Sequence, residues 1–188
     1  MPVTVGVALA RARAASRTSL PFRAVNRADA PDYHPGMQRH HLLPRQLLAK
    51  RCFGALFEAI GKSRIGFDDF RANGLLLPAT DAAAQRIGLP MHRGPHREYN
   101  QMVIERVGQM ESAWAQLRLR APEIAADEAT VRLRLLQKAL RRRLLDPARQ
   151  RLTLNRHHPL DREPDFAELD AMADTLWAGT ALAECPLF

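Results

Sequence analysis

The chain has 188 residues, 46% of them hydrophobic, enough for one compact domain or a small domain with a helical extension. Its 28 lysines and arginines exceed its 20 aspartates and glutamates, giving a net charge of +8. Arginine dominates that excess and its planar fork suits phosphate, which favours nucleic acid as partner, although a compositional bias would give the same charge. The two cysteines, Cys52 and Cys185, are far apart, which excludes a disulfide scaffold.

The N-terminal segment is basic. Residues 11–27 contain five arginines and no acidic residue. We expect residues 1–30 to form a flexible basic arm, which either follows a phosphate backbone or has no role of its own. The apolar run at residues 3–9 is too short to span a membrane and lacks the flanks of a signal peptide. We therefore expect no membrane partner and a cytoplasmic location, with a secreted effector as the alternative.

A histidine pair lies in the first predicted strand. Residues 37–43 are expected to form this strand, which contains His40 and His41. Neighbouring residues of a strand point to opposite faces, so either the backbone bends at the pair or the two histidines play different parts. The strand is followed by a predicted helix over residues 44–60, because apolar residues, Cys52 among them, recur three or four positions apart.

The next segment is predicted to return the chain to a second strand. Residues 62–72 are interpreted as a loop, and Asn73 followed by glycine as a turn. Three leucines ended by a proline then predict a strand at residues 75–77. Residues 81–87 are expected to form one or two helical turns, closed by a glycine.

Helices dominate the rest of the chain. Hydrophobic periodicity predicts one helix from residue 95 to about 120, and another over residues 127–145 with Val131 and Leu135 on its apolar side. A last helix is expected to begin at Asp165, where a capping box is present.

Two further histidines lie before and at the start of the first long helix. His92 and His96 are four residues apart, a spacing that converges on one metal ion when the segment is helical. The intervening glycine and proline also allow these ligands to span a loop and the first helical turn. A strand end carrying His40 and this helix start would then meet over one divalent ion.

The order of these motifs resembles the AHH family of the HNH / endonuclease VII superfamily, whose members are ββα-metal nucleases. Arg39 stands where the family name records a small residue, so the family pattern itself assigns no chemistry to this position. The resemblance implies an α+β, mostly helical fold, with a nuclease module at residues 31–120 and a helical extension at 121–188 packed on it. It is carried by three motifs, Gly-Met-Gln-Arg-His-His-Leu-Leu-Pro at 36–44, Asn-Gly-Leu-Leu-Leu-Pro at 73–78, and His-Arg-Gly-Pro-His-x-x-Tyr-Asn at 92–100.

The resemblance also implies roles for the histidines. His41 would be the general base, because a neutral imidazole accepts a proton from water. His40, His92 and His96 would hold one divalent ion, with positions left for water and the scissile phosphate. Imidazole ligands suit Zn²⁺ or Ni²⁺, whereas hydrolysis in the cell would use Mg²⁺ or Mn²⁺.

Polar residues would support that site. Asn73 would hold the loop that carries His41 and so fix the angle of the imidazole. Arg39 or Arg93 would offset the charge that develops on the phosphate.

Three hypotheses about function follow. The first is an endonuclease that cuts nucleic acid, DNA rather than RNA, with one metal ion. The second is a non-catalytic nucleic-acid-binding module with a structural zinc site, and the third is an interaction protein built on a decayed nuclease core. The helices after residue 110 would complete the core, form a homodimer face or receive an immunity protein if the chain is a toxin.

Overall fold

The computed structural model describes residues 18–146 and Leu154 of the chain. The fold is mostly helical with one small antiparallel sheet, which confirms the predicted α+β class. The described elements are, in chain order, the 3-10 helix η1 (Phe22–Ala24), β1 (Met37–His41), α2 (Gln46–Ala49), the 3-10 helix η2 (Arg51–Phe53), α3 (Gly54–Ile60), α4 (Lys62–Ile65), α5 (Phe70–Asn73), β2 (Gly74–Pro78), α6 (Asp81–Ile87), α7 (Arg97–Leu117) and α8 (Pro122–Leu145).

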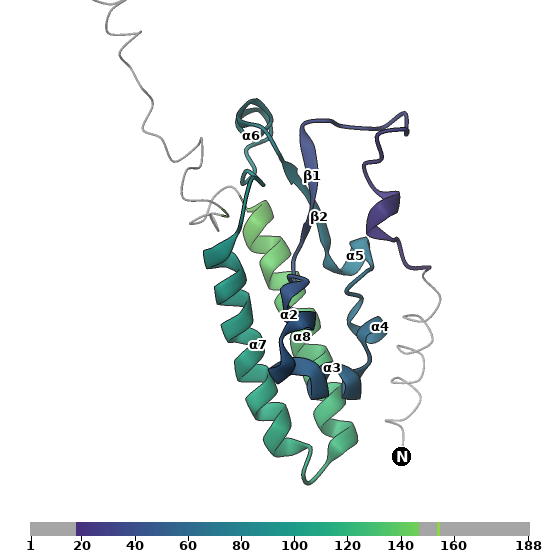
Figure 1. The fold of residues 1–188 in the computed structure, drawn as a ribbon, viewed down its shortest axis with the longest axis vertical. Helices are drawn as coiled ribbons and strands as arrows, with labels where there is room; N and C mark the ends of the chain where they lie inside the picture. The colour runs from purple at the N-terminus through teal and green to yellow at the C-terminus, as the bar shows by residue number, and fades with distance from the viewer. Residues whose placement is uncertain (1–17, 147–153, 155–188) are drawn as a thin grey trace, which may run out of the picture.

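The two strands are joined by a long excursion. β1 pairs antiparallel with β2, and His40 lies opposite Leu75 in the register. Residues 42–73 carry the short helices between the strands, and these lie below the sheet beside α7 and α8 (Figure 1). The site at the end of β1 is therefore supported by helices rather than by further strands.

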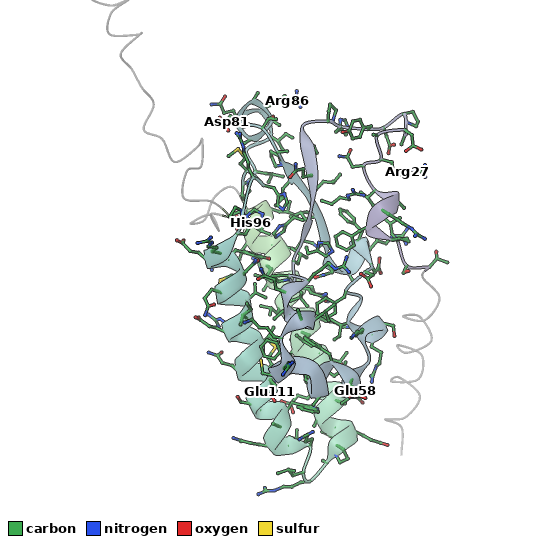
Figure 2. The ribbon with its side chains drawn as sticks, in the orientation of Figure 1. Arg27, Glu58, Asp81, Arg86, His96 and Glu111 are labelled. Carbon is green, nitrogen blue, oxygen red and sulfur yellow. The ribbon has the colours of Figure 1, made fainter. Side chains whose placement is uncertain are left out.

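Helices α7 and α8 form the long antiparallel hairpin of the molecule (Figure 1). α8 packs against α3, α4, α5 and α7. Pro122 starts α8, because a proline lacks only an N–H that the first helical turn would leave unpaired. The side-chain view in Figure 2 places His96 at the end of α7 nearest the sheet and Glu111 toward its other end. The helix thus presents its first turn to the strands.

The single helix predicted over residues 44–60 is wrong. The chain instead forms α2, η2 and α3, and Lys50 interrupts them with extended backbone angles (φ −82°, ψ 117°). This interruption lets Leu47 and Phe53 both enter the core with α3, although they lie on different short helices. Cys52, one of the apolar residues on which that prediction rested, is exposed rather than part of the core.

The loop predicted at residues 62–72 contains two short helices, α4 and α5. Gly66 ends α4 with a positive φ of 72°, and a Cβ there would lie 2.8 Å from that of Ala72. Asn73 ends α5 rather than opening a hairpin. Gly74 has an extended φ of −108°, and a Cβ on it would overlap the Phe70 ring. Close packing, not a turn, requires the glycine.

The apolar side predicted for α8 is partly wrong. Val131 and Leu135 are 54% and 57% exposed, whereas Leu133 is fully buried. Two polar side chains are buried beside it, and both are hydrogen-bonded: Thr130 to the Ala126 carbonyl and Gln137 to the Ile65 carbonyl. Apolar residues occur all around this helix, so periodicity alone did not distinguish its core face.

Some predictions lie outside the described residues. These are the first part of the basic arm and the last helix from Asp165, with most of the C-terminal extension. Within the described residues, no helix combines the length and hydrophobicity needed to cross a membrane.

Candidate metal centre and adjacent basic cleft

Strand β1 sends its histidines to opposite faces. Side chains two apart share a face, so Gln38 lies with His40 and Arg39 lies with His41. His40 is only 3% exposed, whereas His41 is partly exposed. The backbone bends directly after His41, where β1 ends. The two histidines therefore serve neighbouring but different surroundings.

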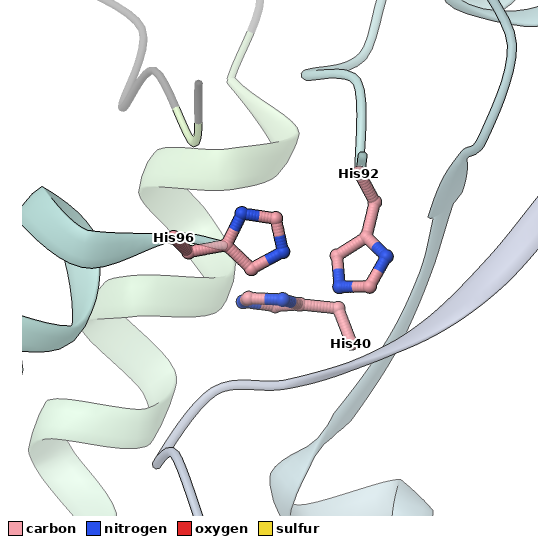
Figure 3. Close-up of side chains that lie close together, drawn as sticks. All are labelled: His40, His92 and His96. Carbon is pink, nitrogen blue, oxygen red and sulfur yellow. The ribbon is translucent and has the colours of Figure 1, made fainter. Parts of the chain in front are cut away.

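On one face, three imidazoles meet. One ring nitrogen from each of His40, His92 and His96 lies within 4.8 Å of the other two. The ring centroids are 5.0 Å apart for His40 and His92, and 4.5 Å apart for His92 and His96. Figure 3 shows the three rings facing one another from β1, from the loop before α7 and from the start of α7. Three segments distant in sequence thus place their ligands around one point.

Hydrogen bonds hold His92 and His96 in this arrangement. The backbone N–H of His92 donates to the carbonyl of Pro78 at the end of β2, over 2.6 Å. Nδ1 of His92 lies 3.0 Å from Oε1 of Gln38, and Nδ1 of His96 lies 3.3 Å from the carbonyl of Leu154. Both oxygens only accept, so both Nδ1 atoms carry the proton and the Nε2 lone pairs stay free for a metal ion.

His40 supplies the test of whether a cation fits. Its Nε2 is buried and meets no hydrogen-bond partner among the described residues. A buried polar nitrogen without a partner is costly. One ring nitrogen of this imidazole lies within 4.8 Å of a ring nitrogen of His92 and of His96, where a metal ion would bind. Burial, together with the nearby imidazoles, lowers the pKa of His40 to about 2, and burial lowers the pKa of His92 to about 4. Neutral imidazoles are the form that coordinates Zn²⁺ and similar ions, so this donor set fits one.

On the other face, His41 opens into a cleft of about 550 Å³. Phe22 stacks on the imidazole, with the ring centroids 3.8 Å apart and the planes 3° from parallel. Arg23, Arg39 and Arg45 line the same cleft. Burial lowers the pKa of His41, and the charges of Arg45 and Arg39 lower it further against an opposing effect of Asp68. His41 is thereby kept neutral beside three cationic side chains.

Arg39 is fixed at the rim of this cleft. Its Nη1 donates to the carbonyls of Phe22 and Val25, at 2.9 and 3.3 Å. The guanidinium therefore links β1 to the segment that stacks on His41. Its other N–H groups can serve an anion, because a guanidinium has five donors. Arg93, the alternative to Arg39 for offsetting charge on the phosphate, is exposed.

Asn73 and Tyr99 hold the backbone that follows the histidine pair. Asn73 is fully buried, and its Nδ2 donates a hydrogen bond to the carbonyl of Phe67 over 3.2 Å. The backbone N–H of Leu42 donates to the carbonyl of Asn73 over 2.8 Å. Tyr99 donates its hydroxyl to the carbonyl of Leu42 over 2.7 Å, and Gln137 of α8 donates to Oδ1 of Asn73 over 3.3 Å. These contacts fix the bend after His41.

Sequence reasoning missed three residues of this region. Gln38 was recognisable, because it precedes His40 by two positions on a strand and must share its face. Phe22 and Arg45 carried no such signal, since only the tertiary fold brings them to His41. The structure brings His40, His92 and His96 together and leaves His41, Arg39 and Asn73 around the adjacent cleft and bend.

Two strands, a following helix and a cluster of histidines around one point agree with the ββα-metal arrangement that the sequence motifs led us to expect. The chain belongs to the AHH family, a nuclease family of the HNH/ENDO VII superfamily with conserved AHH, whose sequence model matches residues 22–140. This match covers more than half of the chain, and it includes every histidine of the cluster. Comparisons with curated proteins and with solved structures gave no match.

Proposed function

We propose that the protein is a metal-dependent endonuclease that hydrolyses phosphodiester bonds of nucleic acid, with DNA favoured over RNA. The observation that carries this proposal is the meeting of one ring nitrogen each from His40, His92 and His96 within 4.8 Å, next to another histidine, His41, in an arginine-lined cleft. Membership of a nuclease family implies a nucleic-acid substrate and supports the same conclusion.

The proposed chemistry divides between the two faces of β1. His40, His92 and His96 would hold one divalent ion, Mg²⁺, Mn²⁺, Zn²⁺ or Ni²⁺, which supplies Lewis-acid stabilisation of the charge on the phosphate and on the leaving oxygen. His41 takes the proton from the attacking water as its oxygen bonds to phosphorus and the P–O3′ bond breaks. The lowered pKa of His41 keeps its imidazole uncharged near neutral pH, and an uncharged imidazole can accept a proton.

Three arginines and one asparagine complete the proposed machinery. Arg39, with Arg23 and Arg45, would pair with the phosphate oxygens, because all three line the cleft of His41. Asn73 acts as a positioning residue, since its hydrogen bonds hold the backbone that follows His41.

Supercoiled plasmid is the direct test. Full-length protein with Mg²⁺ or Mn²⁺ should convert it to nicked and linear forms, which an enzyme requiring a free end cannot do. His41→Ala should abolish cutting while metal still binds, and His34→Ala, a change at an exposed histidine, should leave cutting intact. Equal cutting by the His41→Ala variant would refute the assignment of the base. Metal binding without cutting by the unaltered protein would instead favour a structural zinc module. Parallel reactions on single-stranded RNA test the preference for DNA.

A further inference from the structure

A second cavity is lined by residues of α8 and of the segment that carries α4 and α5. These elements pack together (Figure 1). The volume of the cavity is about 600 Å³. We call it the α8 groove. Its charged lining consists of Arg64, Arg71, Arg134, Lys138, Arg141 and Asp69.

Among the described residues, few carboxylates compensate the positive charge of the α8 groove. Arg64 pairs with Asp127, with 2.8 Å between Nη2 and Oδ1. Asp69, the one carboxylate of the charged lining, already accepts from the backbone N–H groups of Leu20 and Arg71, each over 3.0 Å. The other four cationic side chains of the lining therefore share one carboxylate, and that carboxylate is already hydrogen-bonded to the backbone. An anion is the ligand that such a surface favours.

Three of these cations lie in one row. Arg134, Lys138 and Arg141 follow one another at intervals of four and three residues, so they share one face of α8. From first to last they span about 10 Å of helix rise. One strand of duplex DNA carries one charge for about every 3.4 Å of helix axis, so a row of this length can reach more than one phosphate of a backbone.

The two arginines of this row are held in place. Nη2 of Arg134 donates to the carbonyl of Arg64 over 2.9 Å, and Nη2 of Arg141 donates to the carbonyl of Arg71 over 2.8 Å. Each bond uses one terminal nitrogen of a guanidinium that has five N–H donors. Burial lowers the pKa of Arg141, so part of its hydration is lost, and no carboxylate of the described residues replaces it. Fixed guanidinium forks of this kind are suited to phosphate.

The α8 groove also adjoins the cleft of His41. Pro21 and Asp68 line the cleft, whereas Ser19 and Asp69 line the groove. Leu20 lies between them in the chain and is clasped to α5, because the backbone N–H of Phe70 donates to its carbonyl over 2.7 Å. A polyanion lying in the cleft can therefore continue across this clasp into the groove.

We propose that the α8 groove binds backbone phosphates of the nucleic acid at a distance from the bond that is cut. The inference rests on the proposed function for the identity of the polyanion. An acidic protein is the less suitable occupant, because protein interfaces centre on exposed apolar and aromatic side chains. The large apolar side chain of this groove, Ile65, is 1% exposed.

The test compares two pairs of substitutions in full-length protein that also carries His41→Ala, so that the probe stays intact. The first pair is Arg134→Gln with Lys138→Gln. The matched control is Arg106→Gln with Arg120→Gln, which removes the same charge from exposed positions of α7 and of the turn after it. Affinity for a short labelled duplex DNA of arbitrary sequence is measured over a series of salt concentrations.

The groove pair should weaken binding about tenfold at low salt and reduce the slope of log K against log salt by about 2 relative to the control pair. Equal affinity and slope for the two pairs would overturn the inference, and so would an absence of DNA binding by the parent. Circular dichroism checks folding, and Lys138→Gln alone, which breaks no hydrogen bond that the structure shows, provides a second variant. Plasmid cutting by protein with an intact His41 separates the two proposals. If the protein cuts but the groove pair does not affect DNA binding, only the role of the α8 groove is refuted. If DNA binding depends on the groove pair but the protein does not cut, only the nuclease activity is refuted.

Discussion

Asn73 and Leu43 are joined by two hydrogen bonds, in which Oδ1 of Asn73 accepts from the Leu43 N–H over 2.7 Å and Nδ2 donates to the Leu43 carbonyl over 3.1 Å. The asparagine thus pairs with the backbone as a neighbouring strand would, in a place where the two-stranded sheet has ended. The backbone that follows His41 is therefore held by a buried side chain.

Removing this asparagine should destabilise the protein. Asn73→Ala leaves a buried N–H and a buried carbonyl of Leu43 without their partner, which should lower the free energy of unfolding by about 2 to 4 kcal/mol. Urea unfolding measures the difference. Asn100→Ala, which removes an exposed hydrogen bond to Gln46, is the control and should cost less than about 0.5 kcal/mol. Similar losses for the two variants would contradict the role given to Asn73.

Gln38 should set the affinity for metal without touching the ion. Gln38→Ala removes the acceptor of the His92 Nδ1 proton and frees that ring to rotate, so metal affinity should fall by about 10- to 100-fold. Competition with a chelating dye measures the affinity. Gln109→Ala, at an exposed position of α7, is the matched control and should bind metal like the unaltered protein. Unchanged metal affinity after Gln38→Ala would contradict the prediction that Gln38 orients His92 for metal binding.

Phe22 should act on the rate of cutting through His41. Phe22→Ala removes the ring that stacks on the imidazole and should lower kcat about tenfold, because a loosely held base is misplaced. Phe22→Tyr retains an aromatic ring and should restore most of the rate. Metal affinity should be the same in both variants, since Phe22 lies on the face of β1 opposite the histidine cluster. A change in KM alone would indicate substrate contact rather than positioning.

Metal should stabilise the fold. An ion that binds only the folded chain raises the free energy of unfolding by about 2.7 kcal/mol at a concentration 100 times its Kd. Thermal unfolding with and without Zn²⁺, or after treatment with a chelator, measures this gain. His40→Ala should abolish the gain and His34→Ala should keep it. If His40→Ala gains as much as the unaltered protein, the ion binds elsewhere.

The metal-free protein should lose stability in mild acid. Folding lowers the pKa of His40 to about 2 and of His92 to about 4, below the ordinary value of 6.5. The unfolded chain therefore binds more protons, so stability is present above the unfolded pKa of about 6.5 and falls as the pH drops toward the folded values, by at most about 1.4 kcal/mol per pH unit for each group. Urea unfolding in the presence of chelator measures this slope. Replacement of both histidines by asparagine should reduce the slope of stability against pH. An unchanged slope would show that other groups cause the loss of stability.

The sequence predicted the strands and the positions of the histidines because both depend on local patterns. The alternation of faces along β1 and the motifs themselves can be recognised in short stretches of sequence. The burial of Gln137 was not predictable from periodicity, because partners far along the chain decide it. Gln137 is buried since it reaches Asn73 and Ile65, 64 and 72 residues away. The division into a module at residues 31–120 and an extension after it remains a prediction.

Because successive side chains of β1 point to opposite faces, the chemistry depends on the residue count of that strand. A single insertion or deletion before His40 that kept the pairing would turn it toward the cleft and His41 toward the cluster. The segment between Pro78 and His92 is different, since the 2.6 Å hydrogen bond between these residues closes it at its base. Length variation among relatives should therefore accumulate around α6 and be absent from β1.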